Sequence, residues 1–425
     1  MSASEPETFA QKALRRASGA TRKLEPGEIV DAVPDLYMSH TASWRCIKTL
    51  EQLPGAKLLH PDRVAMVMDH TSPAHTSKIA SYHRLCRDFA RKQGIKTFYD
   101  VNSGIAHLVL MENGHVRPGD FIIGTDSHST IYGALGAFGT GVGFSEITAA
   151  WVTGTIWMRV PESIRINING DLAPGVYPKD LMLRLIGDLT ADGATYCSIE
   201  FDGSHIRQLP VSQRMTLCNL AMEMGAKNAV VAADEATRQY LAEAGIEAAY
   251  EGRLVADEGA TYKQIINLKC EEIEPQVSCP HSVDNVKPIS SVAGTPLDQV
   301  FIGSCANAKY DDLVEAARIL KGRQVAKNVR LIVTPGSREI LEKISLDGTL
   351  ATFVQAGALI TNPGCGACAG DGGVMADGER TLSTANRNFR GRMGSYDAEI
   401  FLASPATAAA SAVAGTIADP RELIA

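Results

Sequence analysis

The chain has 425 residues, which is too many for one hydrophobic core, so two or three domains are expected. Hydrophobic residues make up 45% of the sequence and charged residues 21%, proportions typical of soluble globular proteins. The formal net charge of −7 argues against a general nucleic-acid or membrane-surface binder, and no apolar run reaches the roughly 18 residues that span a bilayer.

The cysteines and the start of the chain bear on the compartment. The nine cysteines are scattered and odd in number, which favours a reducing compartment over a disulfide-bonded secreted protein. The N-terminus has no apolar signal core, and residues 9–16 are expected to form a short amphipathic helix. We therefore expect a cytoplasmic protein.

Residues 1–160 are predicted to form a first α/β domain. Their hydrophobic pattern alternates between the periods of strands and helices. The expected strands cover residues 28–38, 63–68, 96–100 and 121–124, and the expected helices cover residues 44–52 and 77–92.

Polar side chains follow several of these strands, where α/β folds commonly place their sites. Taken alone, a neighbouring acid and histidine also suit a helix cap with a surface histidine, and a lone histidine is more often structural. The cluster at residues 125–129 combines an acid, hydroxyls and an imidazole, which is costly to bury unless it binds something. The candidate residues are Asp69, His70, His107, Asp126, Ser127 and His128.

A glycine-rich stretch follows at residues 133–143. Glycines this frequent suit tight turns and close backbone approach. The stretch lacks a clean dinucleotide-binding fingerprint, with no strand–helix unit that places an acid about 20 residues further on. Packing around a site is the better interpretation.

The remaining residues are predicted to form two more α/β domains, at 161–285 and 286–425. Glu200 lies in one expected strand, where a glutamate by itself usually faces solvent. Residues 270–288 are interpreted as a linker between the two domains. The expected strands are 163–169, 195–201, 300–303 and 329–333, and the expected helices are 180–189, 215–224, 234–244, 311–320 and 403–418.

Three cysteines lie in small-residue surroundings in the last domain. Cys365 and Cys368 form a C-x-x-C turn, and Cys305 follows an expected strand. Thiolates are soft ligands suited to iron–sulfur clusters and zinc, and three of them suit a [4Fe–4S] cube with one iron left without a protein ligand. A redox dithiol or a zinc site with a further ligand remains open at this point.

An arginine cluster follows the C-x-x-C turn. Arg387, Arg390 and Arg392 lie within six residues. Such a cluster often forms a solvated face. Close to a cofactor it would suit carboxylate recognition, because the guanidinium fork matches a carboxylate.

Taken together, these motifs resemble the aconitase superfamily, and within it the 3-isopropylmalate dehydratase (isopropylmalate isomerase) large subunits. The likeness runs from about residue 24 to about residue 416. It is carried by residues 68–70, 104–107, 124–128, 133–143, 192–195, Glu200, 303–305, 363–368 and 386–392.

The resemblance implies three α/β domains packed around a [4Fe–4S] cluster with one iron lacking a protein ligand. It implies cluster ligation by Cys305, Cys365 and Cys368. It further implies substrate binding by Ser127, Asn386, Arg387 and Arg392. Catalytic acid–base and orienting roles would fall to Asp69, His70, His107, Asp126, His128 and Glu200.

Two features depart from the family pattern. Long single-chain members carry a swivelling domain with the base serine and further arginines, and no segment here resembles it, so a separate small subunit and a hetero-oligomer are expected. Residues 41–45 and 306–309 also differ from the usual motifs. Because these positions surround the expected substrate, they bear on substrate identity and not on reaction type.

The expected function is that of the large subunit of an iron–sulfur hydro-lyase acting on a 2-hydroxy dicarboxylate. The first choice of substrate is 3-isopropylmalate, in leucine biosynthesis. Homoaconitate, 2,3-dimethylmalate and maleate or citraconate hydration are alternatives of the same class. A non-catalytic RNA-binding regulator is a remote alternative, because the chain is acidic and has no basic stripe.

Overall fold

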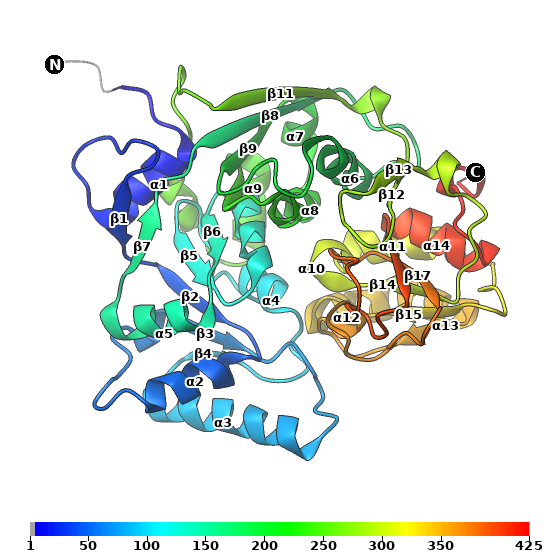
Figure 1. The fold of residues 1–425 in the computed structure, drawn as a ribbon, viewed down its shortest axis with the longest axis horizontal. Helices are drawn as coiled ribbons and strands as arrows, with labels where there is room; N and C mark the ends of the chain where they lie inside the picture. The colour runs from blue at the N-terminus through cyan, green and yellow to red at the C-terminus, as the bar shows by residue number, and fades with distance from the viewer. Residues whose placement is uncertain (1–4, 425) are drawn as a thin grey trace.

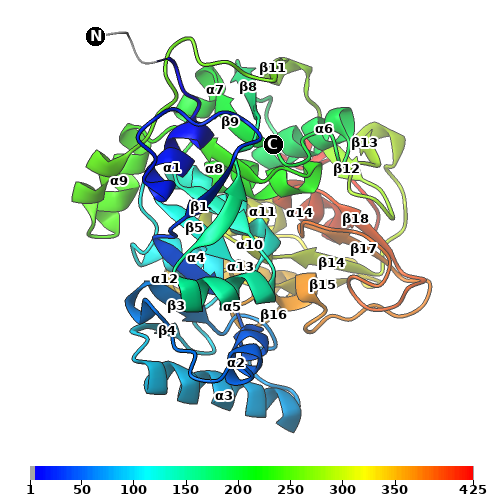
Figure 2. The ribbon, with the colours of Figure 1, turned by 60° about the vertical axis from the view of Figure 1, so that its left-hand side comes forward.

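Three larger sheets, parallel or mostly parallel and formed in chain order, organise the protein, beside a two-stranded antiparallel pair. The computed structural model describes residues 5–424. The first unit lies at the lower left of Figure 1, the second across its top, and the third at its right, with the last helices in orange and red. Figure 2 shows the second unit at the top, the first unit below it, and the third unit at the right. This is the α/β class expected from the sequence.

The first sheet has five parallel strands in the order β4-β3-β2-β5-β6. Alternate residues face opposite sides of it, because side chains in a strand alternate. Met38 and Val67 pack in the core shared with α4, whereas Tyr37 and Met66 pack in a second core with α2 and α3. The strands are β2 (Leu36–Ser39), β3 (Val64–Val67), β4 (Thr97–Tyr99), β5 (Phe121–Gly124) and β6 (Phe138–Gly141), and the helices are α2 (Ser43–Glu51), α3 (Ser77–Gln93), α4 (Ala106–Glu112) and α5 (Phe144–Thr153).

The second sheet has four parallel strands in the order β10-β9-β8-β11. The alternating isoleucines of β8 are all buried, as expected for a strand in the middle of such a sheet. The strands are β8 (Ser163–Asn169), β9 (Ser198–Asp202), β10 (Asn228–Val231) and β11 (Gln264–Lys269), and the helices are α6 (Pro178–Leu189), α7 (Ser204–Gln208), α8 (Val211–Leu220) with η3 (Ala221–Met224), and α9 (Glu235–Glu243).

The third sheet has seven strands in the order β13-β12-β18-β17-β14-β15-β16. Its strands β14 to β18 run parallel, and β12 pairs antiparallel with both of its neighbours. The strands are β12 (Gln276–Ser278), β13 (Val286–Pro288), β14 (Gln299–Ile302), β15 (Arg330–Val333), β16 (Leu359–Ile360), β17 (Arg380–Ser383) and β18 (Glu399–Leu402), and the helices are α10 (Ser304–Asn307), α11 (Tyr310–Leu320), α12 (Arg338–Leu346), α13 (Thr349–Ala356) and α14 (Pro405–Ala414).

Two segments differ from the sequence-based expectation. Residues 28–38 form two strands, because Pro34 interrupts the run, and β1 (Ile29–Ala32) pairs antiparallel with β7 (Ile156–Arg159) outside the first sheet. The expected linker at 270–288 contains β12 and β13, which join the third sheet. The boundaries proposed at residues 160 and 285 remain predictions, and residues 1–4 and 425 lie outside the described part.

The first helix, α1 (Phe9–Ser18), forms where the sequence predicts it. Thr8 caps its start and Gly19 ends it in the left-handed conformation, as helix termini prefer. Among residues 5–424, no helix combines the length and apolar character needed to cross a membrane.

The carboxyl ends of the first and third sheets turn toward the same space. In the first sheet, β2, β3 and β5 end at Ser39, Val67 and Gly124, immediately before the polar motifs. In the third sheet, β14 and β17 end immediately before the segments that carry Cys305 and Asn386. Parallel α/β sheets bind ligands beyond the carboxyl ends of their strands, so this space is where a site is expected.

Gly133 fixes the distance between the first unit and the second. It lies in η2 (Ser127–Leu135), which starts next to Asp126 and packs against β10 and α8. A β-carbon added at Gly133 would stand 1.7 Å from the backbone oxygen of Ala229 in β10. Two backbones therefore meet here at a distance that only glycine permits.

We predict that Gly133→Ala lowers the free energy of unfolding by about 1–3 kcal/mol, because the added methyl group forces the two backbones apart. Urea unfolding followed by circular dichroism measures this change. Gly252→Ala is the matched control, since its added carbon meets one atom at 3.2 Å, the backbone oxygen of Pro118. Equal unfolding midpoints for the two variants would contradict the prediction.

Candidate active site and metal centre

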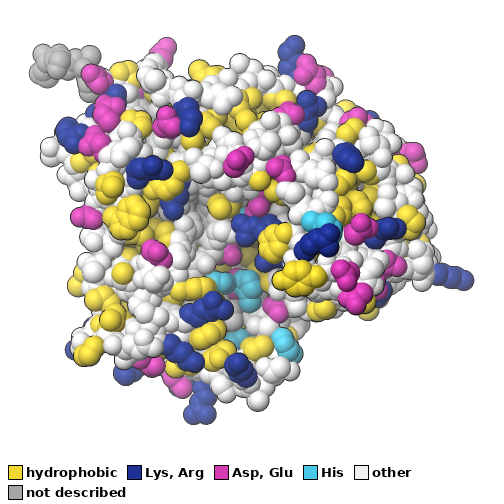
Figure 3. All heavy atoms as spheres, viewed as in Figure 1, with side chains coloured by type: hydrophobic (Ala, Val, Ile, Leu, Met, Phe, Trp, Pro, Cys, Tyr) yellow, Lys and Arg dark blue, Asp and Glu magenta, His cyan; other side chains and the backbone are white. Residues whose placement is uncertain are grey.

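All but three of the predicted site residues converge on one cavity. The cavity lies beyond the carboxyl ends of the first and third sheets. Figure 3 shows a hollow between the three units, with histidine and basic side chains gathered in it. The predicted residues that line the cavity are Asp69, His70, His107, Asp126, His128, Cys305, Cys365, Cys368, Asn386 and Arg392.

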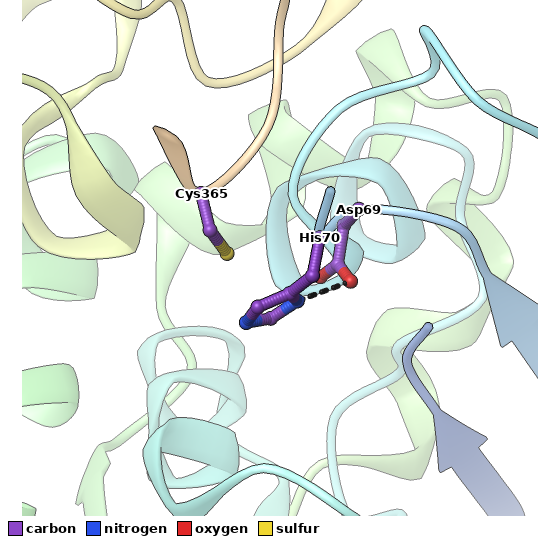
Figure 4. A group of neighbouring side chains, drawn as sticks. All are labelled: Asp69, His70 and Cys365. Carbon is purple, nitrogen blue, oxygen red and sulfur yellow. Dashed lines mark hydrogen bonds and ion pairs between the residues drawn. The ribbon is translucent and has the colours of Figure 1, made fainter. Parts of the chain in front are cut away.

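Asp69 and His70 follow β3 and form a buried acid–imidazole pair. The Asp69 carboxylate accepts a hydrogen bond from His70 Nδ1 at 2.7 Å, and its other oxygen accepts from the backbone N–H of Ala106 at 3.0 Å. Figure 4 shows the His70 ring between this carboxylate and the Cys365 sulfur. The second ring nitrogen of His70 therefore remains free to act toward the cavity.

The charges of this pair shift both pKa values. Burial alone would lower the pKa of His70, but the charge and hydrogen bond of Asp69 outweigh it and raise that pKa to about 9. Burial would raise the pKa of Asp69, but the His70 charge and hydrogen bond hold it well below its usual range. At neutral pH the pair is therefore a carboxylate and an imidazolium. Next to it, burial lowers the pKa of His40 to about 4, so that histidine is neutral.

Asp126 follows β5 and joins two histidines. Its carboxylate lies 3.0 Å from His107 Nε2 and accepts from the backbone N–H of His128 at 2.8 Å. The other ring nitrogen of His107 contacts the hydroxyl of Tyr132 at 3.1 Å. Burial opposes ionisation of Asp126, but hydrogen bonds from His107 and His128 hold its pKa far below the usual range.

Glu223 is a site residue that the sequence analysis missed. It lies in η3 of the second unit, and its carboxylate is 2.7 Å from His128 Nε2 and accepts from Arg387 Nε at 2.9 Å. Burial opposes its ionisation, but these partners lower its pKa, and it in turn contributes to the raised pKa of His128. The available signal was an acid within the apolar run 220–224, where an isolated charge would be costly.

Glu200, in contrast, does not line the cavity. It is buried on β9, where its carboxylate accepts from the backbone N–H of Phe9 and from the hydroxyl of Tyr262, both at 2.9 Å. Unlike most strand glutamates, Glu200 does not face solvent, and it helps to hold the first helix against the second sheet. The catalytic role that the resemblance implies for Glu200 stays a prediction. Ser127 and Arg387 also lie outside the cavity lining. Arg387 is connected to the lining residue His128 through Glu223, which contacts both side chains.

The cysteines come from two segments of the third unit. Cys305 lies in α10, directly after β14, and follows Ser304, which has a φ of 79°. A left-handed conformation is uncommon outside glycine and is found at functional sites. Cys365 immediately precedes η7 (Gly366–Ala369), and Cys368 lies within it. The backbone N–H of Cys365 donates to the backbone oxygen of Asp69 at 3.1 Å.

The donors around these cysteines fit the iron–sulfur group that the resemblance implies. Two side-chain amides, from Asn219 and Asn386, donate to Cys305 Sγ at 3.1 and 3.2 Å. Arg392 Nη2 lies 3.7 Å from Cys368 Sγ. Donors aimed at sulfur stabilise thiolates, and a cluster needs thiolate ligands.

Burial makes the thiols of Cys305 and Cys365 poor acids when no metal is present. It raises the pKa of Cys305 to about 12 and that of Cys365 far above its usual range. Metal binding would replace these protons. A simpler metal site is also possible, because donor atoms of Asp69, His70 and Cys365 lie within 4.8 Å of one another. Asp69 Oδ1 and His70 Nδ1 are already hydrogen-bonded to each other, so the three thiols are the better-supported ligand set.

Comparisons with known proteins agree with this geometry. The family model described as "Aconitase family (aconitate hydratase)" matches residues 16–296 and 290–415. The chain is 48% identical to the 3-isopropylmalate dehydratase large subunit 1 of Methanopyrus kandleri, over 98% of this chain and 99% of the relative. It is 46% identical to the protein of that name from Archaeoglobus fulgidus, over 98% and 99%.

A relative with a different name is nearly as similar. The chain is 44% identical to a probable methanogen homoaconitase large subunit of Methanothermobacter thermautotrophicus, over 97% of both chains. The family match spans most of the sequence, and the relatives are similar along nearly their whole length. The chain therefore belongs to the aconitase family.

Proposed function

We propose that this chain is the large subunit of an iron–sulfur hydro-lyase that reversibly dehydrates a 2-hydroxy dicarboxylate, with 3-isopropylmalate of leucine biosynthesis as substrate. The observation that carries the proposal is the convergence of three cysteines with the Asp69–His70 and Asp126–His107 pairs on one cavity. The names of several relatives support this substrate.

Cys305, Cys365 and Cys368 would hold the [4Fe–4S] cluster. With three protein ligands, one iron would have none, and it would supply Lewis-acid chemistry to the substrate hydroxyl. Asn219 and Asn386 would orient Cys305 through their hydrogen bonds to its sulfur. Asn386 is therefore proposed to support a cluster ligand, which differs from the substrate contact expected from the sequence.

The acid–imidazole pairs would supply the proton that the departing hydroxyl takes up. His70 carries a proton at neutral pH and has a ring nitrogen free of Asp69, so it suits a general acid. Asp126 would orient His107 and His128. We assign Glu223, and not Glu200, as the remaining acid, because Glu223 contacts His128 directly.

Arg392 and Arg387 would bind the substrate carboxylates. Arg392 Nε is buried and has no hydrogen-bond partner among the described residues, so it retains a donor for an incoming carboxylate. Arg387 is held by Glu223, so a substrate carboxylate would share it or replace that contact. Ser127 remains a proposed substrate contact on sequence grounds.

A small subunit is proposed to complete the site. Dehydration needs a base at the carbon that loses its proton. Among the described lining residues, the one side-chain hydroxyl is that of Ser304, which donates to Thr384 O at 3.1 Å and lies 3.3 Å from Asn386 Oδ1. The relatives are named large subunits, which supports a partner chain and a hetero-oligomer.

All nine cysteines are free, which suits a reducing compartment such as the cytoplasm.

Homoaconitate is the second candidate substrate, because two relatives are named probable methanogen homoaconitase large subunits. We predict that the reconstituted chain is inactive alone and that it converts 3-isopropylmalate once its small subunit is added. The assay follows the absorbance of the unsaturated acid, which appears with 3-isopropylmalate, homoaconitate or 2,3-dimethylmalate and disappears with maleate or citraconate. Turnover by the large chain alone would remove the two-subunit proposal, and a preference for another acid would replace the substrate.

We predict that Cys365→Ser loses most of the bound iron and sulfide, since it removes one of three proposed ligands. Anaerobic reconstitution followed by iron and sulfide analysis measures the loss. Cys197→Ala is the control, because Cys197 is buried in the second unit and does not line the cavity. Full cluster content in the Cys365 variant would show that the assigned ligand set is wrong, and one bound zinc would favour a zinc site.

We predict that kcat/KM of the two-subunit enzyme falls as the pH rises through about 9, because His70 then loses its proton. The pKa is raised, so the protonated form is present below pH 9 and is lost above it. Asp69→Asn removes the carboxylate charge and should move this limb down by about 1–3 pH units. An unshifted limb in the variant would assign the titration to another group.

A further inference from the structure

Lys179 is a fully buried lysine that the proposed reaction does not use. It lies in the first turn of α6, has 0% of its surface exposed, and is among the largest fully buried side chains. Its Nζ donates to two backbone oxygens, those of Thr384 at 3.0 Å and Ala385 at 2.8 Å. No carboxylate of residues 5–424 forms an ion pair with it.

A second buried lysine shows the usual solution. Lys309 Nζ lies 2.7 Å from a carboxylate oxygen of Asp312, so its charge has a protein partner. A buried ammonium with only carbonyl partners is costly, because the two carbonyl dipoles replace little of its hydration. An anion near Lys179 would offset that cost.

The surroundings of Lys179 indicate where such an anion would lie. Thr384 and Ala385 immediately precede Asn386, whose amide donates to Cys305 Sγ. The backbone oxygen of Thr384 also accepts from Ser304 Oγ, next to Cys305. Lys179 therefore supports the loop behind the cysteine sulfurs.

The charges that act on Lys179 point the same way. Burial is the main cause that lowers the pKa of Lys179 to about 8; the charges of Cys368 and Cys305 oppose this shift, and that of Lys309 adds to it. Three thiolates around an iron–sulfur core give a net negative charge that grows by one unit on reduction. Net charge and nearby cations set both the reduction potential and the retention of such clusters.

We propose that Lys179 is the buried counter-cation of the site formed by Cys305, Cys365 and Cys368, and that its charge stabilises the bound cluster from the protein interior. The inference rests on the proposed iron–sulfur function. Lys179 acts as a positioning and charge-balancing residue, because it reaches the thiols only through the 384–386 loop and its electric field.

The test replaces Lys179 with glutamine, which can still donate to a carbonyl but carries no charge, and with arginine, which keeps the charge. Lys227→Gln is the matched control, because Lys227 Nζ also donates to a backbone carbonyl, that of Gly141 at 3.2 Å, outside the cavity. Each full-length chain is reconstituted anaerobically. The readouts are the thermal midpoint of the metal-free chain, the rate of iron loss to a chelator, and the reduction midpoint by electron paramagnetic resonance.

We expect metal-free Lys179→Gln to be at least as stable as the metal-free parent, because an uncompensated buried charge has been removed. With the cluster bound, it should lose iron about ten-fold faster and have a more negative reduction midpoint. Lys179→Arg and Lys227→Gln should keep the parent midpoint.

Three outcomes would overturn the inference. Parent-like iron loss and midpoint in Lys179→Gln would remove any role in the cluster. A metal-free glutamine variant that is less stable or does not fold would make Lys179 a structural residue. Equal midpoint shifts in the glutamine and arginine variants would exclude charge as the cause. If the parent chain itself takes up no iron and sulfide, the proposed function fails instead, and the two failures are distinguishable.

Discussion

The carboxyl ends of two parallel sheets face one cavity, and the polar interior of this protein depends on that convergence. Charged side chains are costly to bury singly, so each must meet a partner from another segment. The cavity brings such partners together: Asp69, which follows β3, accepts from the backbone N–H of Ala106 in α4, and Asp126, which follows β5, meets His107 of α4. Fold and site are therefore specified by the same contacts.

Acidic side chains in this interior lie between basic ones. Glu223 joins His128 to Arg387, so the second unit contributes an acid between residues of the first and third. The amides of Asn219 and Asn386 bond each other and Cys305 in the same way. Because every unit contributes to the network, a displacement of any one unit would leave buried groups without partners.

The strands and the residues that follow them could be predicted from the sequence, because a buried parallel strand and its polar end are local patterns. The C-x-x-C turn was recognisable for the same reason. Glu223 could not be recognised, because its meaning comes from His128 and Arg387, which are distant in the chain. The catalytic role of Glu200 was expected from the family likeness, whereas its partners, Phe9 and Tyr262, are distant in the chain and form no local pattern. Pro34 was a local signal for the break in the first expected strand.

The bond between the backbone N–H of Cys365 and the oxygen of Asp69 joins segments nearly 300 positions apart. During synthesis, the first sheet emerges long before the segment that carries Cys365, Cys368 and Arg392. Its polar strand ends must therefore stay hydrated until almost the whole chain has left the ribosome. Insertion of the proposed cofactor would consequently be a late, post-translational event, and the open half-site is the form that chaperones or assembly factors would meet.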